Sequence, residues 1–150
     1  MRFILTRELG KLARWLRILG HDAVYFKEDK LSSLIIEALR DDRIILTRNH
    51  RLSSPGGVRV ILIEKEKMGE QIPEVLQKLS IEVKKEQMFS RCILCNGELV
   101  SLEKKKIQDR VPEYVFNTQN NFLSCPQCRR IYWQGTHWGN VENTLKEMIK

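Results

Sequence analysis

Cys92-Ile93-Leu94-Cys95 and Cys125-Pro126-Gln127-Cys128 are the two stretches that decide how the second half of this 150-residue chain folds. They hold all four cysteines of the sequence, and 29 residues (96 to 124) separate them. Two such turns aim four thiolates at one point, which is the spacing of a tetrahedral zinc site. Two disulfides or a redox-active CxxC motif would not explain two matched pairs. The ligands predicted for a structural zinc ion in a zinc ribbon are Cys92, Cys95, Cys125 and Cys128.

The remaining composition favours metal-bound thiolates. We expect no signal peptide, because the apolar run Phe3-Ile4-Leu5 is followed at once by Arg7 and Glu8. No stretch approaches the roughly 18 apolar residues of a membrane span. We therefore expect a cytoplasmic protein without a membrane partner, in a reducing environment where paired cysteines bind metal more readily than they form disulfides.

The first 80 residues alternate between strand and helix patterns. This alternation predicts an α/β fold, with a parallel sheet flanked by helices. The polar segment Lys84-Lys85-Glu86 marks a linker, so the expected domains are residues 1–86 and 87–150. A short helix is expected from Asn140. The expected strands are 2–5, 23–26, 44–47 and 58–63, and the expected helices are 8–19, one capped by Ser32 or Ser33, and one that includes 72–79.

The charge pattern indicates a polyanion partner. The chain carries 26 Lys and Arg residues against 19 Asp and Glu residues, a net charge of +7, which suits RNA or another nucleic acid. On the first expected helix, four basic residues fall within an arc of about 120°, opposite a leucine stripe. Such an arc is either an ordinary solvated face or a phosphate-binding face. The predicted nucleic-acid contacts are Arg7, Lys11, Arg14 and Arg17, with Trp15 to stack on a base, and Arg48 after the third strand.

The carboxyl ends of the strands are where an open α/β sheet gathers its site residues. Here they present Thr6, and then Thr47, Arg48 and Asn49. A metal-dependent nuclease needs three or four carboxylates at such a place to hold Mg²⁺ or Mn²⁺. This sequence offers hydroxyl and amide groups instead. The candidate catalytic residues are therefore Glu8, Glu28, Asp29, Asn49 and Thr6.

Several motifs resemble the Mut-seven C-terminal RNase domain family, a PIN-like nuclease fold with an appended zinc ribbon. The resemblance extends to about Trp138 and implies RNase activity that uses acids at the strand ends. The motifs that carry it are Leu9-Gly10-Lys11-Leu12-Ala13-Arg14-Trp15-Leu16-Arg17, Ile45-Leu46-Thr47-Arg48, Phe89-Ser90-Arg91-Cys92, Cys95-Asn96-Gly97, Asp109-Arg110-Val111-Pro112, and Tyr132-Trp133 through His137-Trp138.

This chain departs from the family pattern at three positions. The family usually has an aspartate where this chain has Thr6, and another where it has Asn49. The acidic pair that opens the second helix aligns with Leu31 and Ser32. A neutral group can contact a divalent ion, but it neither supplies the negative charge that concentrates the ion nor acts as a base toward water.

Three hypotheses follow, and the sequence alone does not decide whether the protein is an enzyme. The first, which we favour, is an RNA-binding protein with a degenerate acidic site that uses the basic helix and the zinc ribbon. The second is a ribonuclease that holds Mg²⁺ or Mn²⁺ in a site rebuilt from the remaining acids. The third is a protein-interaction module, whose family motifs lock the ribbon against the first domain through Phe89, Arg91, Asp109, Arg110 and Pro112.

Overall fold

The computed structural model describes residues 1–52, 56–134 and 136–149, and the side chains of all of these except 136–139. The chain divides into two compact units, residues 1–96 and residues 97–150. The first unit contains a parallel sheet flanked by helices, which confirms the predicted α/β class. The second unit contains a small antiparallel sheet.

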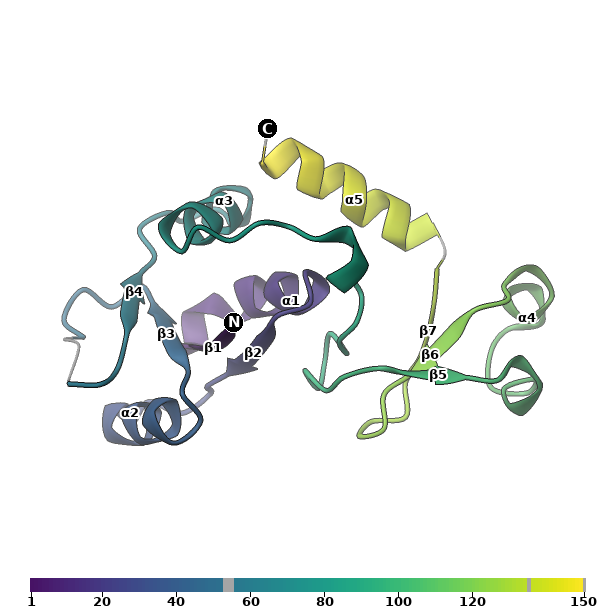
Figure 1. Cartoon of the computed structure of the whole chain (residues 1–150), viewed down its shortest axis with the longest axis horizontal. Coiled ribbons are helices and arrows are strands. Elements are labelled where there is room, and N and C mark those ends of the chain that lie inside the picture. The colour runs from purple at the N-terminus through teal and green to yellow at the C-terminus, as the bar shows by residue number, and fades with distance from the viewer. Residues whose placement is uncertain (53–55, 135, 150) are drawn as a thin grey trace. The chain divides into compact units, whose positions relative to one another are not determined.

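A four-stranded parallel sheet forms the centre of the first unit (Figure 1). Its order is β2-β1-β3-β4, so β1 lies between two neighbours and is buried on both faces. Phe3, Ile4 and Leu5 are each 0% exposed, as expected for a strand covered on both sides. In register, Ile4 lies opposite Val24 on β2 and opposite Ile45 on β3. The strands are β1 (Arg2–Leu5), β2 (Asp22–Tyr25), β3 (Ile44–Thr47) and β4 (Val60–Leu62).

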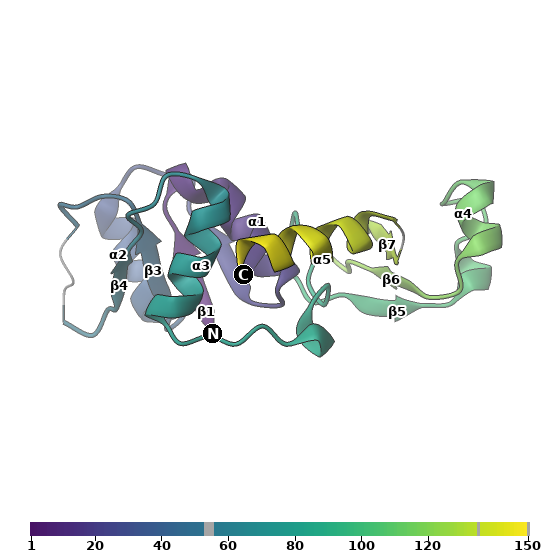
Figure 2. The same cartoon turned by 90° about the horizontal axis from the view of Figure 1, so that it is seen from above.

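Helices cover both faces of this sheet. Figures 1 and 2 show α1 (Gly10–Ile18) and α3 (Met68–Lys78) on one face and α2 (Leu31–Arg40) on the other. Leu12 and Leu16 of α1 are completely buried, because they belong to the apolar stripe that alternates with the basic positions. On the opposite face, Leu34 of α2 packs into a cluster with Ile4 and Ile45. A single 3₁₀ turn, η2 (Lys85–Gln87), follows α3.

Three helix boundaries differ from the sequence-based expectation. A 3₁₀ turn, η1 (Arg7–Leu9), precedes α1, because the amide of Leu9 donates to the carbonyl of Thr6 three residues earlier at 2.9 Å. Helix α2 begins at Leu31 without a side-chain cap from Ser32 or Ser33. The last helix, α5 (Thr136–Met148), begins four residues before Asn140. Among the described residues, none of the helices combines the length and apolar character that crossing a bilayer requires.

The second unit is built on the three-stranded antiparallel sheet β5-β6-β7. Its small core consists of the buried residues Ile107, Val115 and Phe122, and the ring of Trp133 packs at 6.4 Å from that of Phe122. A core of this size contributes little stability by itself. The elements are β5 (Val100–Leu102), η3 (Lys104–Lys106), α4 (Glu113–Thr118), β6 (Phe122–Ser124), β7 (Ile131–Trp133) and α5.

His21 makes the stability of the first unit depend on pH. Its ring packs edge-on against Phe3, with the ring centroids 5.9 Å apart. Burial, the N-terminal amine and Arg91 lower the pKa of His21 from 6.5 to about 4. The unfolded chain therefore takes up a proton near pH 6.5, whereas the folded chain takes it up only near pH 4. Stability attributable to His21 is complete above pH 6.5 and is lost as the pH falls toward 4.

We expect the free energy of unfolding to fall by about 1 kcal/mol between pH 7 and pH 5 through His21. A fully buried group would give about 2 kcal/mol over this range, and partial exposure reduces the effect. Urea unfolding at the two pH values measures it. The His21→Gln variant should lose this part of the pH dependence, while His50→Gln, at an exposed histidine, should keep it. Equal pH dependence in the wild type and His21→Gln would refute the prediction.

Candidate functional site

The four cysteine side chains come together as a candidate metal centre. Their Sγ atoms all lie within 4.8 Å of one another. Zinc–sulfur bonds of about 2.3 Å in a tetrahedron place the sulfurs about 3.8 Å apart, so the cluster fits a metal ion such as zinc. Cys92 and Cys125 are buried, and Cys128 is exposed. Four thiolates fill a tetrahedral shell and leave no position for water or substrate, which is the arrangement of a structural site.

The two CxxC pairs have the same backbone turn. The amide of Asn96 donates to the carbonyl of Cys92 at 2.9 Å, and the amide of Arg129 donates to the carbonyl of Cys125 at 2.8 Å. Asn96 and Arg129 also share a left-handed conformation, with φ of 68° and 63°. Asparagine adopts this conformation more readily than most residues, whereas arginine adopts it at a cost. The residue after each pair therefore closes the turn that presents the two thiols.

Hydrogen bonds within the first unit hold the first cysteine pair in place. Arg17 on α1 donates from Nη1 to the carbonyl of Ile93 at 2.7 Å and to that of Leu94 at 3.3 Å. The Asn96 side chain accepts from the amide of Ala23 at 2.9 Å. The amide of Phe89 donates to the carbonyl of Ile18 at 2.8 Å. Residues 89–96 are therefore attached to α1 and β2 at several points.

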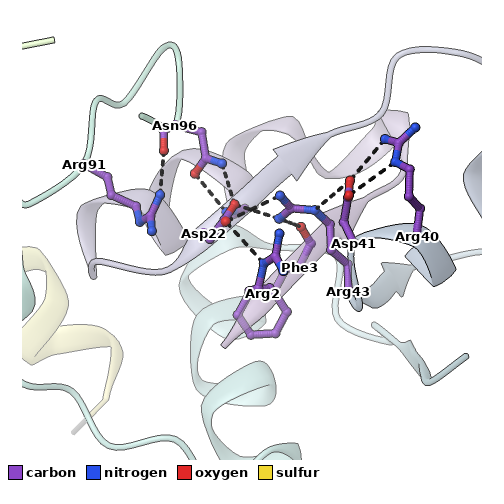
Figure 3. Close-up of polar contacts among 9 residues, drawn as sticks. Arg2, Phe3, Asp22, Arg40, Asp41, Arg43, Arg91 and Asn96 are labelled. Atoms are coloured by element: carbon purple, nitrogen blue, oxygen red, sulfur yellow. Dashed lines mark hydrogen bonds and ion pairs between the residues drawn. The ribbon is translucent and has the colours of Figure 1, made fainter. Parts of the chain in front are cut away.

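Asp22 is the centre of a polar network that reaches this segment (Figure 3). Its Oδ1 accepts from Nη1 of Arg43 and from Nδ2 of Asn96, each at 2.6 Å. Arg2 forms an ion pair with the same carboxylate at 3.6 Å. Burial alone would raise the pKa of Asp22, but the hydrogen bonds from Arg43 and Asn96 outweigh it and lower the pKa below 3.8. The ionised carboxylate therefore joins the amino ends of the strands to the turn after Cys95.

The carboxyl ends of β1 and β3 bring Thr6, Thr47 and Glu8 together. Oε1 of Glu8 accepts from Oγ1 of Thr6 at 2.6 Å and from the amide of Arg48 at 3.0 Å. The hydroxyls of Thr6 and Thr47 lie 3.0 Å apart. Burial acts to raise the pKa of Glu8, but the hydrogen bonds from Thr6, Arg48 and Thr47 lower it below 4.5. One oxygen of this carboxylate is therefore already occupied by protein donors.

A small cavity of about 150 Å³ lies at these strand ends. Glu28 and Asp29 line it together with Thr6, Glu8 and Asn49. Asp29 is 3.2 Å from Arg7 in an exposed ion pair, and Oδ1 of Asn49 accepts from the amide of Arg51 at 3.0 Å. Ser32 is exposed in the first turn of α2. Within the described ranges, the four cysteines are the one group of three or more potential ligands whose atoms lie within 4.8 Å of one another. The acids Glu8, Glu28 and Asp29 surround this cavity without forming such a group.

The predicted nucleic-acid contacts occupy three different environments. Arg7 is paired with Asp29, and Arg17 is buried at 8% exposure against carbonyl groups. Lys11 and Arg14 are exposed, and Trp15 is half-buried. Arg48 is half-buried too, and in the described part of the chain its buried Nε has no hydrogen-bond partner. Helical projection placed the four basic residues 7, 11, 14 and 17 in one arc but did not separate the buried Arg17 from the exposed cations.

Comparison with family models matches residues 1–145 to the family described as Mut7-C RNAse domain. The chain belongs to the Mut7-C RNase domain family. The match confirms the resemblance of the sequence motifs to this family. The same comparisons found no match among curated proteins or solved structures.

In this Mut7-C chain, neutral residues stand at three positions where the resemblance implies acids. Thr6 and Asn49 follow the first and third strands, and Ser32 lies in the first turn of α2. Their hydroxyl and amide groups carry no negative charge. Family membership indicates a nuclease-related or RNA-related function.

Sequence reasoning missed the roles of Asp22, Arg43 and Asn96. Asn96 offered a signal, because an Asn-Gly step directly after a CxxC pair favours a left-handed turn. Asp22 and Arg43 offered none, since their pairing depends on the order of the strands. The motif through His137 and Trp138 ends in side chains that lie outside those described.

Proposed function

We propose that this Mut7-C chain binds RNA through cationic residues of its PIN-like first domain, with a zinc ribbon as its structural second module and without a working acidic site. The observation that carries the proposal is the chemistry at the strand ends. There, Thr6, Thr47 and Asn49 are neutral, and Glu8 is held by a hydroxyl and a backbone amide. The family supports RNA as the ligand, and the net charge of +7 supports a polyanion.

A second candidate is a ribonuclease with a rebuilt metal site. It is favoured by one observation, that Glu8, Glu28 and Asp29 line one cavity. Mg²⁺ or Mn²⁺ would supply the charge stabilisation and an activated water. The chain would then have to break the Arg7–Asp29 ion pair and draw the carboxylates together. We rank this candidate below RNA binding because that rearrangement opposes contacts that are already present.

The two candidates predict different results with single-stranded RNA. We expect fluorescence anisotropy to show binding that weakens steeply from 50 to 200 mM salt, because phosphate contacts release counterions. We also expect denaturing gels to show intact RNA after incubation with Mn²⁺ or Mg²⁺. The matched control is Glu8→Gln, purified in parallel, which should give the same gel and the same affinity.

Two outcomes would contradict the proposal. Cleavage by the wild type that Glu8→Gln abolishes would establish the nuclease instead. Absence of RNA binding at 50 mM salt, or an affinity that does not change with salt, would show that the chain does not make the phosphate contacts on which the proposal depends.

A further inference from the structure

A second cavity in the first unit, of about 680 Å³, lies apart from the strand ends. It is lined by α1, by β2 and by the turn of the first cysteine pair, and it shares no residue with the cavity around Glu8. Cavities of this size are typical of small-ligand and cofactor sites. We call it the α1–β2 pocket. Its charged lining residues are Lys11, Arg14, Arg17 and Lys27.

The charged side chains that line the α1–β2 pocket are all basic and lie beside the candidate metal ligand Cys95. Four cations line the pocket, and no Asp or Glu does. Lys11, Arg14 and Lys27 are exposed, and none of them forms a hydrogen bond or an ion pair with another residue in the described part of the chain. Arg7, on the neighbouring turn, differs because Asp29 neutralises it at 3.2 Å. Three free cations around one cavity form a site for an anion.

Arg17 gives the pocket a fixed positive centre. Its side chain is only 8% exposed, and Nε and Nη1 donate to the carbonyls of Ala23 and Ile93 at 2.8 and 2.7 Å. These bonds determine the plane of the guanidinium. Within the described residues, Nη2 makes no hydrogen bond. Cys92, Cys95 and Asp22 act electrostatically on Arg17, and its hydrogen bonds in the described part of the chain all go to carbonyl groups. An arginine held in this way is preorganised to receive a phosphate oxygen.

The pocket also has an apolar wall that suits a nucleoside. The ring of Tyr25 is held in place, because it packs 3.4 Å from the position of a Cβ on Gly10 and its hydroxyl donates to the carbonyl of Arg7. Leu94 belongs to the lining and is 46% exposed, so its side chain is accessible to a ligand. An aromatic ring and an aliphatic side chain beside several cations are what RNA-binding surfaces offer to a base and its phosphate.

From this arrangement we infer that the α1–β2 pocket binds one phosphate of a single-stranded RNA, with the attached nucleoside against Tyr25 and Leu94. This inference rests on the proposed RNA binding and specifies where the strand is held. Lys11, Arg14 and Lys27 contact the phosphate from the rim, and Arg17 contacts it from the floor.

A charge-matched pair of triple variants tests the inference. The pocket variant is Lys11→Gln, Arg14→Gln and Lys27→Gln. The control variant is Arg59→Gln, Lys67→Gln and Lys84→Gln, which removes the same charge from exposed positions outside the pocket. Each phosphate contact contributes about 0.7 to the slope of log affinity against log salt for single-stranded RNA. Because the three side chains hold one phosphate, we expect the slope of the pocket variant to fall by about 0.7 and the slope of the control variant to stay unchanged. The loss of affinity in the pocket variant should then be about 5-fold larger at 0.1 M salt than at 1 M.

A third variant, Leu94→Ala, separates the nucleoside wall from the phosphate contacts. It should weaken binding while the salt slope stays unchanged. The metal content and melting temperature of each variant, matched to the wild type, show that loss of binding is not loss of fold.

Three results would overturn the inference. The first is equal salt slopes for the pocket and control variants while the wild type binds RNA, which leaves the proposed function intact. The second is a nucleoside monophosphate that binds as tightly as the RNA, since the pocket would then be a nucleotide site. The third is absence of RNA binding by the wild type, which would remove the proposed function as well.

Discussion

We expect the Cys92→Ser variant to lose its bound metal and the fold of residues 97–150, while residues 1–80 stay folded. Cys92 is 0% exposed, so no solvent ligand replaces its sulfur without opening the turn. The second unit relies on the metal because, among the side chains described, the buried cluster of its core is small and consists of Ile107, Val115 and Phe122. Structural zinc contributes about 10 kcal/mol or more to the folding of small metal-binding domains. The first unit retains its own core around Ile4, Leu34 and Ile45.

Metal analysis and hydrogen exchange read by mass spectrometry measure the two effects of Cys92→Ser separately. The matched control is Gln127→Ala, at an exposed residue between Cys125 and Cys128. It should retain one metal ion per chain and slow exchange throughout residues 97–134. A Cys92→Ser protein with a full complement of metal, or with unchanged protection in the second unit, would show that the cysteines do not form a folding site.

The Asp22→Ala variant should reduce the free energy of unfolding of the first unit by about 3 kcal/mol. Its carboxylate neutralises Arg43, whose side chain is only 9% exposed. Removal of one partner of a buried pair costs about 3 to 5 kcal/mol. The 18% exposure of Asp22 and the Asp41 carboxylate, which stays 3.9 Å from Arg43, favour the lower value. The variant also loses the bond to Nδ2 of Asn96, so the turn after Cys95 should exchange its amides faster.

Asp29→Ala is the control for this prediction, because Asp29 also pairs with an arginine. That pair is exposed, with side chains 64% and 83% accessible, and its loss should cost less than about 1 kcal/mol. Urea unfolding of the two variants and the wild type gives the comparison. If Asp22→Ala and Asp29→Ala were equally stable, the network in Figure 3 would not stabilise the unit.

Local pattern was sufficient to predict the sheet and its class. Phe3, Ile4 and Leu5 form an apolar run that is too short for a helix, and helical periodicity follows it, so a covered parallel strand was the natural interpretation. The start of the first helix was less accessible to prediction. Thr6 and Leu9 close a 3₁₀ turn there, and periodicity does not separate such a turn from the helix that continues it.

The candidate site was predicted only where the chemistry is local in sequence. Each CxxC pair specifies its own turn, so the metal ligands could be named from spacing. Arg17 shows the limit of this approach, because a helical projection assigns it to an outer face. In the structure Arg17 is buried, because its guanidinium donates to the carbonyls of Ile93 and Leu94, which lie far from it in the sequence. The α1–β2 pocket forms because residues 93–96 lie against α1 and β2, so no single segment of the sequence predicts it.

The attachment of the first cysteine pair to α1 and β2 has a consequence for biosynthesis. Every hydrogen bond described from Phe89, Arg17 and Asn96 joins residues that are complete once residue 96 has been made. Cys125 and Cys128 come 29 and 32 residues later. At about 5 to 20 residues per second, that delay is roughly 2 to 6 seconds. We therefore expect the nascent chain to present half of its metal site, already shaped, before the other half has emerged from the ribosome.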